Sequence, residues 1–348
     1  MRRFGALLAA LLLAGTLAAC GGQGAREMQT TQIFAMDTVM ALRAAGGETE
    51  AALQAAEEEI YRLDEELSRT REDSAVSRLN SAPAGTAADV GTELYDLIAR
   101  ALDFSAATDG AFDITLAPVS SAWGFTEDAY RVPAQTELDA LLAHVGAEHV
   151  HLEGEGSVSL DEGTRIDLGA IAKGYASDRM AEIFQSHGVT HGIVDLGGNT
   201  WVCGGNLEGD PWQIGIQDPA RESGALAGIL QATDAFAVTS GGYQRYFEED
   251  GATYHHIIDP ATGRPAESGL TSVTVVADGT VGNGTMCDAL STALFVMGEE
   301  RALDLWRSGV YDFDLVLVTA DGRLLVTDGI ADRFQPDETA GYAYEVVS

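Results

Sequence analysis

Apolar residues recur at helical spacing in five separate segments of the chain, which is typical of helices with one buried face. These segments are residues 48–67, 92–107, 136–146, 172–187 and 285–297. In the first of them, the apolar positions three or four residues apart are Leu53, Ala56, Ile60, Leu63 and Leu67. Gly188 follows the fourth segment and provides a helix stop. We therefore expect five amphipathic helices, most of them in the first half of the chain.

Shorter apolar runs bounded by turn-forming residues predict strands, and most of these runs lie in the second half of the chain. The first expected strand is residues 32–42. The later ones are residues 192–196, 201–203, 212–217, 235–238, 254–258 and 272–277, and a hairpin over 314–319 and 324–327. Because helices cluster early and strands late, the pattern predicts an α+β fold in one compact body rather than alternating βαβ units.

The N-terminus has the pattern of an export signal. Two arginines precede an apolar run over residues 4–17, which is shorter than the roughly 20 residues that a spanning helix needs. The run closes on Leu-Ala-Ala-Cys, which resembles the bacterial lipobox and predicts lipidation of Cys20. We expect residues 1–19 to be a lipoprotein signal peptide, 20–30 a flexible tether and 31–340 the catalytic domain. An ordinary signal peptide that contains a cysteine is the alternative.

This interpretation places the protein outside the cytoplasm, anchored to the bacterial membrane and facing the periplasm or the cell exterior. Cys203 and Cys287 could then form a disulfide, although both lie in apolar runs and we expect two buried thiols. With only three cysteines, the chain is not a disulfide scaffold, and no Cys/His cluster has the spacing of a zinc site.

The charge of the chain excludes one class of partner. Its 348 residues carry 54 acids against 20 bases, a net charge of −34, so non-specific binding to nucleic acid is excluded. The apolar fraction of 46% is enough for a sizeable core. The composition is therefore that of a globular, strongly acidic protein.

Glycine, hydroxyl and carboxylate side chains gather between apolar runs at four places, which are residues 109–113, 166–175, 195–199 and 239–243. Glycines in such segments let the backbone approach a ligand and present N–H groups to an anion. Lys173, the single lysine of the chain, lies in the second segment and could point at that anion. Taken one at a time, these segments could equally be tight turns and Lys173 a solvated surface residue.

Two further features predict catalysis and metal binding. His255 and His256 precede an Asp-Pro turn, so they lie at a strand end where a base could operate. Asp288, Ser291 and Thr292 fall on one helix face and offer the hard oxygen ligands that suit Mg²⁺. A structural histidine and a capping aspartate are the alternatives. The negative electrostatic field of an acidic protein repels a diphosphate. Binding one therefore needs a cation and backbone N–H groups that point at the phosphates, which predicts a Mg²⁺-dependent nucleotide site.

In this order along the chain, the motifs resemble those of the FAD:protein FMN transferases, the ApbE family. They are Ala-Met-Asp-Thr at 35–38, Asp-Ser through Asn at 73–80, Gly-Ala-Phe-Asp at 110–113, Asp through Tyr at 167–175, Asp-Leu-Gly-Gly-Asn at 195–199, Thr-Ser-Gly at 239–241, His-Ile-Ile-Asp-Pro at 256–260 and Asp through Thr at 288–292. The likeness covers about residues 31–335. It implies a T-fold-like α+β catalytic domain with a mixed or antiparallel sheet, flanking helices, and FAD in a cleft.

The resemblance also implies site residues. The positions that correspond to FAD contacts are Met36, Thr70, Ala111, Phe112, Asp113, Asp167, Lys173 and Ile258. Mg²⁺ at the diphosphate of FAD would be held by the main-chain oxygen of Ala170, by Asp288 and by Thr292, with Ser291 on the same helix face. His256 stands at the position of the family's candidate general base.

The activity that the resemblance implies is transfer of the FMN half of FAD onto a Ser or Thr hydroxyl of an exported flavoprotein, through a phosphoester, with release of AMP. A Mg²⁺-dependent FAD pyrophosphatase that yields FMN and AMP needs the same residues and is the first alternative. A lipid-anchored flavin-binding protein without turnover is the second.

Overall fold

The fold is built on one nine-stranded sheet. We describe it from a computed structural model, which covers residues 27–126, 129–221 and 224–348. In spatial order the strands are β1 (Gln29–Ala35), β2 (Thr38–Ala45), β6 (His191–Asp195), β7 (Asn199–Cys203), β10 (Ala235–Gly241), β15 (Leu270–Asp278), β16 (Asp314–Thr319), β17 (Arg323–Thr327) and β19 (Ala343–Val347). Neighbouring strands are antiparallel except for β17 and β19, which are parallel. The predicted α+β class with a mixed sheet is confirmed.

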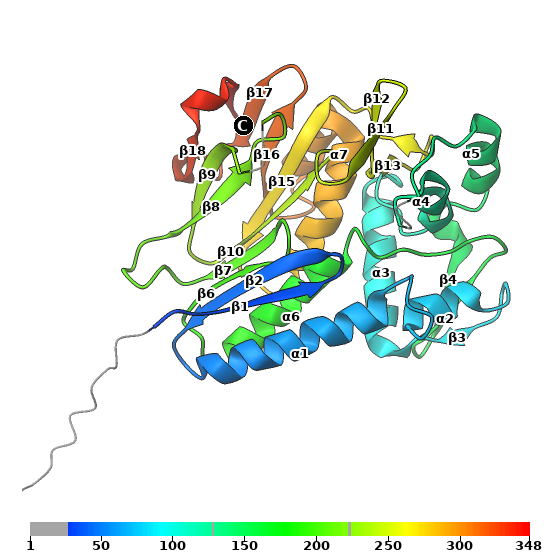
Figure 1. The fold of residues 1–348 in the computed structure, drawn as a ribbon, viewed down its shortest axis with the longest axis horizontal. Coiled ribbons are helices and arrows are strands. Elements are labelled where there is room, and N and C mark those ends of the chain that lie inside the picture. The colour runs from blue at the N-terminus through cyan, green and yellow to red at the C-terminus, as the bar shows by residue number, and fades with distance from the viewer. Residues whose placement is uncertain (1–26, 127–128, 222–223) are drawn as a thin grey trace, which may run out of the picture.

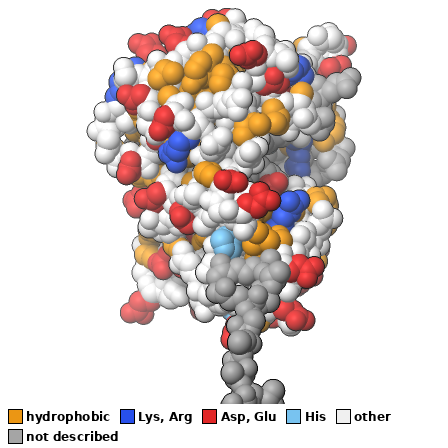
Figure 2. Space-filling view, turned by 90° about the vertical axis from the view of Figure 1, so that its left-hand side faces the viewer, with side chains coloured by type: hydrophobic (Ala, Val, Ile, Leu, Met, Phe, Trp, Pro, Cys, Tyr) orange, Lys and Arg blue, Asp and Glu red, His pale blue; other side chains and the backbone are white. Residues whose placement is uncertain are grey.

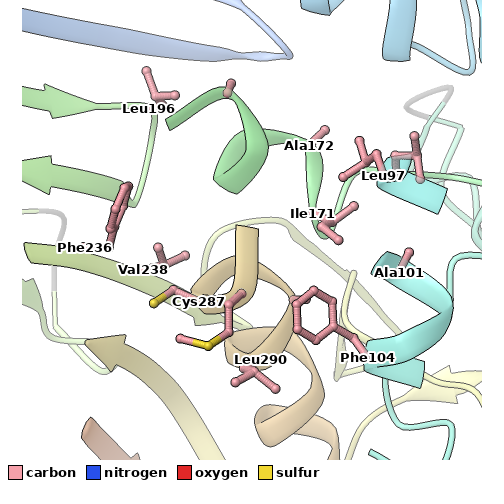
Figure 3. Packing of buried hydrophobic residues seen from close by; sticks show 14 of the residues in the cluster. Leu97, Ala101, Phe104, Ile171, Ala172, Leu196, Phe236, Val238, Cys287 and Leu290 are labelled. Atoms are coloured by element: carbon pink, nitrogen blue, oxygen red, sulfur yellow. The ribbon is translucent and has the colours of Figure 1, made fainter. Parts of the chain in front are cut away.

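Long helices cover one face of this sheet (Figure 1). They are α1 (Thr49–Leu67), α6 (Ala172–Ser186) and α7 (Asn283–Ser308), with α3 (Gly91–Ala107) beside α7. The main core lies between these helices and the sheet. Figure 3 shows Cys287 and Leu290 of α7 between Val238 of β10 and Phe104 of α3.

The opposite face of the sheet has a second, smaller core. It is covered by a three-stranded sheet of β8 (Trp212–Gln217), β9 (Leu226–Ala232) and β18 (Phe334–Pro336). Ile214 and Leu230 of this sheet belong to the same buried cluster as Val202 and Val316 of the main sheet. The main sheet is therefore covered on both faces.

The remaining elements form a lobe beside α3, at the right of Figure 1. They are α2 (Ala75–Ser81), α4 (Ala117–Trp123), α5 (Gln135–Leu142), β3 (Ala88–Asp89), β4 (Val150–Gly154), β5 (Ser157–Leu160), β11 (Tyr246–Glu249), β12 (Ala252–His255), β13 (Ile258–Asp259) and β14 (Arg264–Pro265). Short 3₁₀ turns occur at Ala147–His149 and, on either side of β18 in the sequence, at Ala331–Arg333 and Glu338–Ala340. Val119, Trp123, Phe125, Leu138 and Ile258 form a separate buried cluster in this lobe.

Helices α6 and α7 cross at two glycines. A Cβ on Gly174 would lie 2.3 Å from the carbonyl oxygen of Gly284, and a Cβ on Gly284 would lie 2.7 Å from that of Gly174. Asp178 of α6 accepts hydrogen bonds from the N–H groups of Gly282, Gly284 and Thr285, so it caps the start of α7. This junction fixes where the side chains on the next turn of α7 lie.

Several sequence predictions are corrected. The single strand expected over 32–42 is two strands, β1 and β2, joined at Met36 and Asp37, which have φ of 47° and 58°. The last helix runs from Asn283 to Ser308, with a break in helical geometry at Gly298, and is longer than expected. The seven-residue helices α2 and α4 were not predicted.

Other predictions concern the N-terminus and the thiols. Cys20, the signal peptide and most of the tether lie outside the described residues, and β1 begins at Gln29, two residues before the expected start of the domain. Within the described ranges, no helix has the length and apolar character needed to cross a bilayer. Cys203 and Cys287 are free thiols, and burial raises the pKa of both, that of Cys203 to about 12.

Candidate active site

A cleft of about 1080 Å³ lies between the sheet, α6, α7 and the lobe, and the predicted site residues meet in it. Those that line it are Met36, Thr70, Ala111, Phe112, Asp113, Asp167, Ala170, Lys173, His256, Ile258, Asp288 and Thr292. They come from strands, helices and loops spread over more than 250 positions of the sequence. Their roles in binding and catalysis stay predictions.

The carboxylate of Asp288 is held in place from two sides. The N–H of Gly174 donates to Oδ2 at 2.8 Å, and Nδ2 of Asn199 donates to Oδ1 at 3.3 Å. Both Asp288 and Asn199 are almost completely buried. Gly174, which the sequence suggested as a helix opening for a ligand, instead allows α7 to approach and orients this carboxylate.

Asn199 also carries an unsatisfied acceptor. Its Oδ1 is buried and has no hydrogen-bond partner among the described residues. A buried polar atom without a partner is costly and points to a missing group such as an ion or a water molecule. The signal for Asn199 in the sequence is its place directly after Gly-Gly, at the end of a predicted strand.

Hydroxyl groups continue the row of oxygens along α7. Oγ of Ser240 lies 2.8 Å from Oγ of Ser291 and 3.2 Å from Oγ1 of Thr292. Ser291 is fully buried behind the cleft wall and donates to the carbonyl oxygen of Asp288 at 2.9 Å. Of the predicted oxygen ligands on this helix, Asp288 and Thr292 line the cleft, whereas Ser291 supports Ser240 from behind.

His256 has the tautomer and the protonation state that a base would need. Its Nδ1 lies 3.1 Å from the carbonyl oxygen of Arg245, so Nδ1 carries the hydrogen and Nε2 is left as the acceptor. Burial lowers the pKa of the ring to about 4, and the nearby positive charges of Arg245 and Lys173 add to this. His256 is therefore neutral at physiological pH and able to take a proton.

Asp113 and Asp167 lie at the lobe side of the cleft. Oδ1 of Asp167 accepts from the N–H of Gly169 at 2.8 Å, and Oδ2 pairs with Nε of Arg69 at 2.8 Å. Asp113 accepts from the N–H of Thr115, and burial raises the pKa of its carboxyl group. Arg69 was not predicted, because nothing in its local sequence indicates a partner about 100 positions away.

The cleft carries more negative than positive side chains. Six carboxylates line it, from Asp37, Asp64, Asp113, Asp167, Asp195 and Asp288, against four cations from Arg69, Arg71, Lys173 and Arg245. The surface of the protein is also rich in acids, as the face shown in Figure 2 illustrates. Protein charge alone would therefore not hold a diphosphate in this cleft.

The predicted metal donors differ from a carboxylate cluster. Across the described part of the chain, no group of three or more His, Cys, Asp or Glu side chains is placed to hold a metal ion. The predicted set at Asp288 contains one carboxylate, a hydroxyl and a main-chain carbonyl, and the unsatisfied amide oxygen of Asn199 lies beside it. All of these are hard oxygen donors, which fit Mg²⁺ with phosphate oxygens and water as its other ligands.

Comparison with known proteins gives consistent matches. The model of the ApbE family matches residues 36–315. The chain is similar to the FAD:protein FMN transferase of Treponema pallidum, at 34% identity over 95% of this chain and 94% of the relative, and to that of Vibrio cholerae, at 35% over 76% and 78%. Among solved structures, it resembles the ApbE protein of Thermotoga maritima, with a TM-score of 0.81 and 34% identity over 88% of this chain and 99% of that one. It also resembles the Pseudomonas stutzeri flavinyl transferase ApbE, with a TM-score of 0.77 and 30% identity over 89% of this chain and 97% of that one.

Proposed function

The chain belongs to the ApbE family and is a flavin transferase, and we propose that it moves the FMN half of FAD onto a Ser or Thr hydroxyl of a target flavoprotein. The new bond is a phosphoester, and AMP is released. The observation that carries this proposal is one cleft that combines the oxygen ligands at Asp288 with the neutral imidazole of His256.

We propose that the reaction depends on Mg²⁺ at the diphosphate of FAD. The carboxylate of Asp288, the hydroxyl of Thr292 and the main-chain oxygen of Ala170 would hold the ion, and the orphaned amide oxygen of Asn199 supports this position. When bound, Mg²⁺ supplies neutralisation of the diphosphate charge and polarisation of the phosphorus under attack.

The residues of this chain then position and activate the reactants. Nε2 of His256 accepts the proton of the acceptor hydroxyl, whose oxygen forms a bond to the FMN phosphorus. The bond from that phosphorus to the bridging oxygen breaks, and the electron pair leaves with AMP. General base catalysis of this kind contributes about 10²–10⁴-fold. The ammonium of Lys173 and the N–H groups of the Gly-rich segments orient the phosphates.

The first test is a transfer assay. The protein is incubated with FAD, Mg²⁺ and an acceptor flavoprotein, and the acceptor is weighed by mass spectrometry. We expect a mass gain of FMN less one water, its loss on chelation with EDTA, and free AMP in equal amount. Free FMN beside an unmodified acceptor would support a pyrophosphatase instead, and intact FAD would support a binding protein.

The proposed location of the reaction rests on the N-terminal pattern. We propose that the chain is exported and lipid-anchored through Cys20. The support for this is that basic, apolar and small residues follow one another in that order over residues 1–19. Cys20→Ser should abolish incorporation of labelled fatty acid in cells. Labelling that persists in this variant would contradict the anchor.

A further inference from the structure

Large apolar side chains are exposed at the mouth of the cleft. Among the described residues, the most exposed of these side chains are Phe34 (67%), Val310 (64%), Val39 (62%), Tyr246 (50%) and Val346 (50%). Three of the five, Phe34, Val39 and Tyr246, are close in sequence to residues that line the cleft. We call these three residues the mouth patch.

Two members of the mouth patch lie on the β1–β2 hairpin, next to its tip. Phe34 and Val39 are directly opposite each other in the register of the two strands. Their neighbours Ile33, Ala35 and Met40 are buried, so Phe34 and Val39 are on the outer face of the hairpin. Of the four residues between them, those at positions 36–38 line the cleft.

The third member lies across the mouth. Nη2 of Arg245 is 3.9 Å from Oδ2 of Asp37, so the hairpin tip and the start of β11 approach each other. Tyr246 follows Arg245 directly, and the carbonyl oxygen of Arg245 holds His256. The mouth patch is therefore continuous with the wall of the cleft and close to the proposed base.

We propose that the mouth patch is a docking surface for the acceptor flavoprotein and guides its hydroxyl segment to His256. This inference rests on the proposed function, because a protein acceptor has to reach a base inside the cleft while most of its mass stays outside. Surface that adjoins the mouth is then covered during the reaction, and exposed aromatic and aliphatic groups are what such interfaces use at their centre. The net charge of −34 on the whole chain disfavours an acidic acceptor segment and favours a neutral or basic one.

A lipid surface fits the mouth patch less well. The expected anchor precedes Gln29, and Phe34 lies five positions further along β1, a span of about 17 Å. The patch thus lies at the end of β1 away from the point where the anchored segment enters. Arg245, which precedes Tyr246, has its guanidinium 3.9 Å from the carboxylate of Asp37, so its charge is partly offset and attracts an anionic lipid surface less.

The test compares a folded acceptor with a peptide. The probes are a folded flavoprotein domain that carries an acceptor Ser or Thr and a short synthetic peptide that copies the segment around that residue. Enzyme variants are Phe34→Ser with Val39→Thr, and, as a matched control, Val310→Thr with Val346→Thr, which removes equally exposed apolar groups elsewhere. We expect the hairpin variant to raise KM for the folded domain at least tenfold with kcat unchanged.

The same variant should keep the wild-type affinity for FAD and the wild-type rate with the peptide, and the control should match the wild type throughout. An unchanged KM for the domain, or an equal rise in the control, would overturn the docking surface. Loss of FAD affinity would show that the hairpin shapes the cleft instead. Loss of binding to vesicles of anionic phospholipid, with transfer intact, would assign the patch to a membrane. If the wild-type chain modifies neither probe, the proposed function itself fails.

Discussion

Replacement of Gly174 by alanine tests how the carboxylate of Asp288 is held. The added Cβ would lie 2.3 Å from the carbonyl oxygen of Gly284 and 2.5 Å from Cβ of Asp288, so α6 and α7 have to separate by about 1 Å to restore ordinary contact. Overpacking of this kind costs about 1–3 kcal/mol. Weakening the 2.8 Å hydrogen bond from Gly174 to a buried carboxylate adds about 1.5–3 kcal/mol. The free energy of unfolding should therefore fall by about 2.5–6 kcal/mol.

Urea denaturation followed by circular dichroism measures this loss, and Gly169→Ala is the matched control. Gly169 lies in the same motif, but its nearest neighbour to an added Cβ is a side-chain oxygen of Asp167 at 3.2 Å, and its backbone is not left-handed. We expect the control to lose less than about 1 kcal/mol. Equal stability of Gly174→Ala and the control would refute the account of the α6–α7 junction.

Three further predictions concern single side chains. Asp288→Asn should bind Mn²⁺ at least tenfold more weakly than the wild type in the absence of FAD, as measured by electron paramagnetic resonance. Unchanged binding would remove Asp288 from the metal site. Asp178→Asn should lower the free energy of unfolding by about 2–3 kcal/mol, because an amide no longer accepts all the hydrogen bonds at the start of α7; a smaller loss than 1 kcal/mol in urea would speak against the cap. The pKa of His256 is lowered to about 4, so the neutral form of its ring persists as the pH falls below about 6.5, the usual pKa of a histidine. We therefore expect kcat/KM for the acceptor to stay flat from pH 8 to about 5.5. A tenfold fall over that range, as an unshifted imidazole would give, would contradict the burial of the base.

The apolar period was sufficient for the long helices, and the resemblance to the ApbE family predicted the membership of the cleft. The apolar period placed α1, α3 and α6 within a few residues of their bounds, because each buries one apolar face in the main core. Twelve of the thirteen predicted residues within the described ranges line the cleft, and Ser291 is the exception. Helical spacing put Ser291 and Asp288 on one face but could not show that the wall of the cleft passes between them.

Features that depend on tertiary contacts were not accessible from the sequence. The turn at Met36 and Asp37 carries no Gly, Pro or Asn, and a single Asp within an apolar run was too weak a signal to mark the break between β1 and β2. Arg69 and Asn199 matter through partners 98 and 89 positions away, Asp167 and Asp288. Gly174 had a visible motif but an unexpected reason, since the space it leaves is filled by another helix rather than by a ligand.

The central claim is that this acidic cleft holds the diphosphate of FAD through a cation bound at the start of α7. Anomalous diffraction from crystals grown with FAD and Mn²⁺ tests it most directly. The account predicts an anomalous peak within bonding distance of the carboxylate of Asp288 and the hydroxyl of Thr292, in contact with the phosphate oxygens of FAD. FAD bound with its phosphates elsewhere, or held in the cleft with no peak beside Asp288, would contradict it.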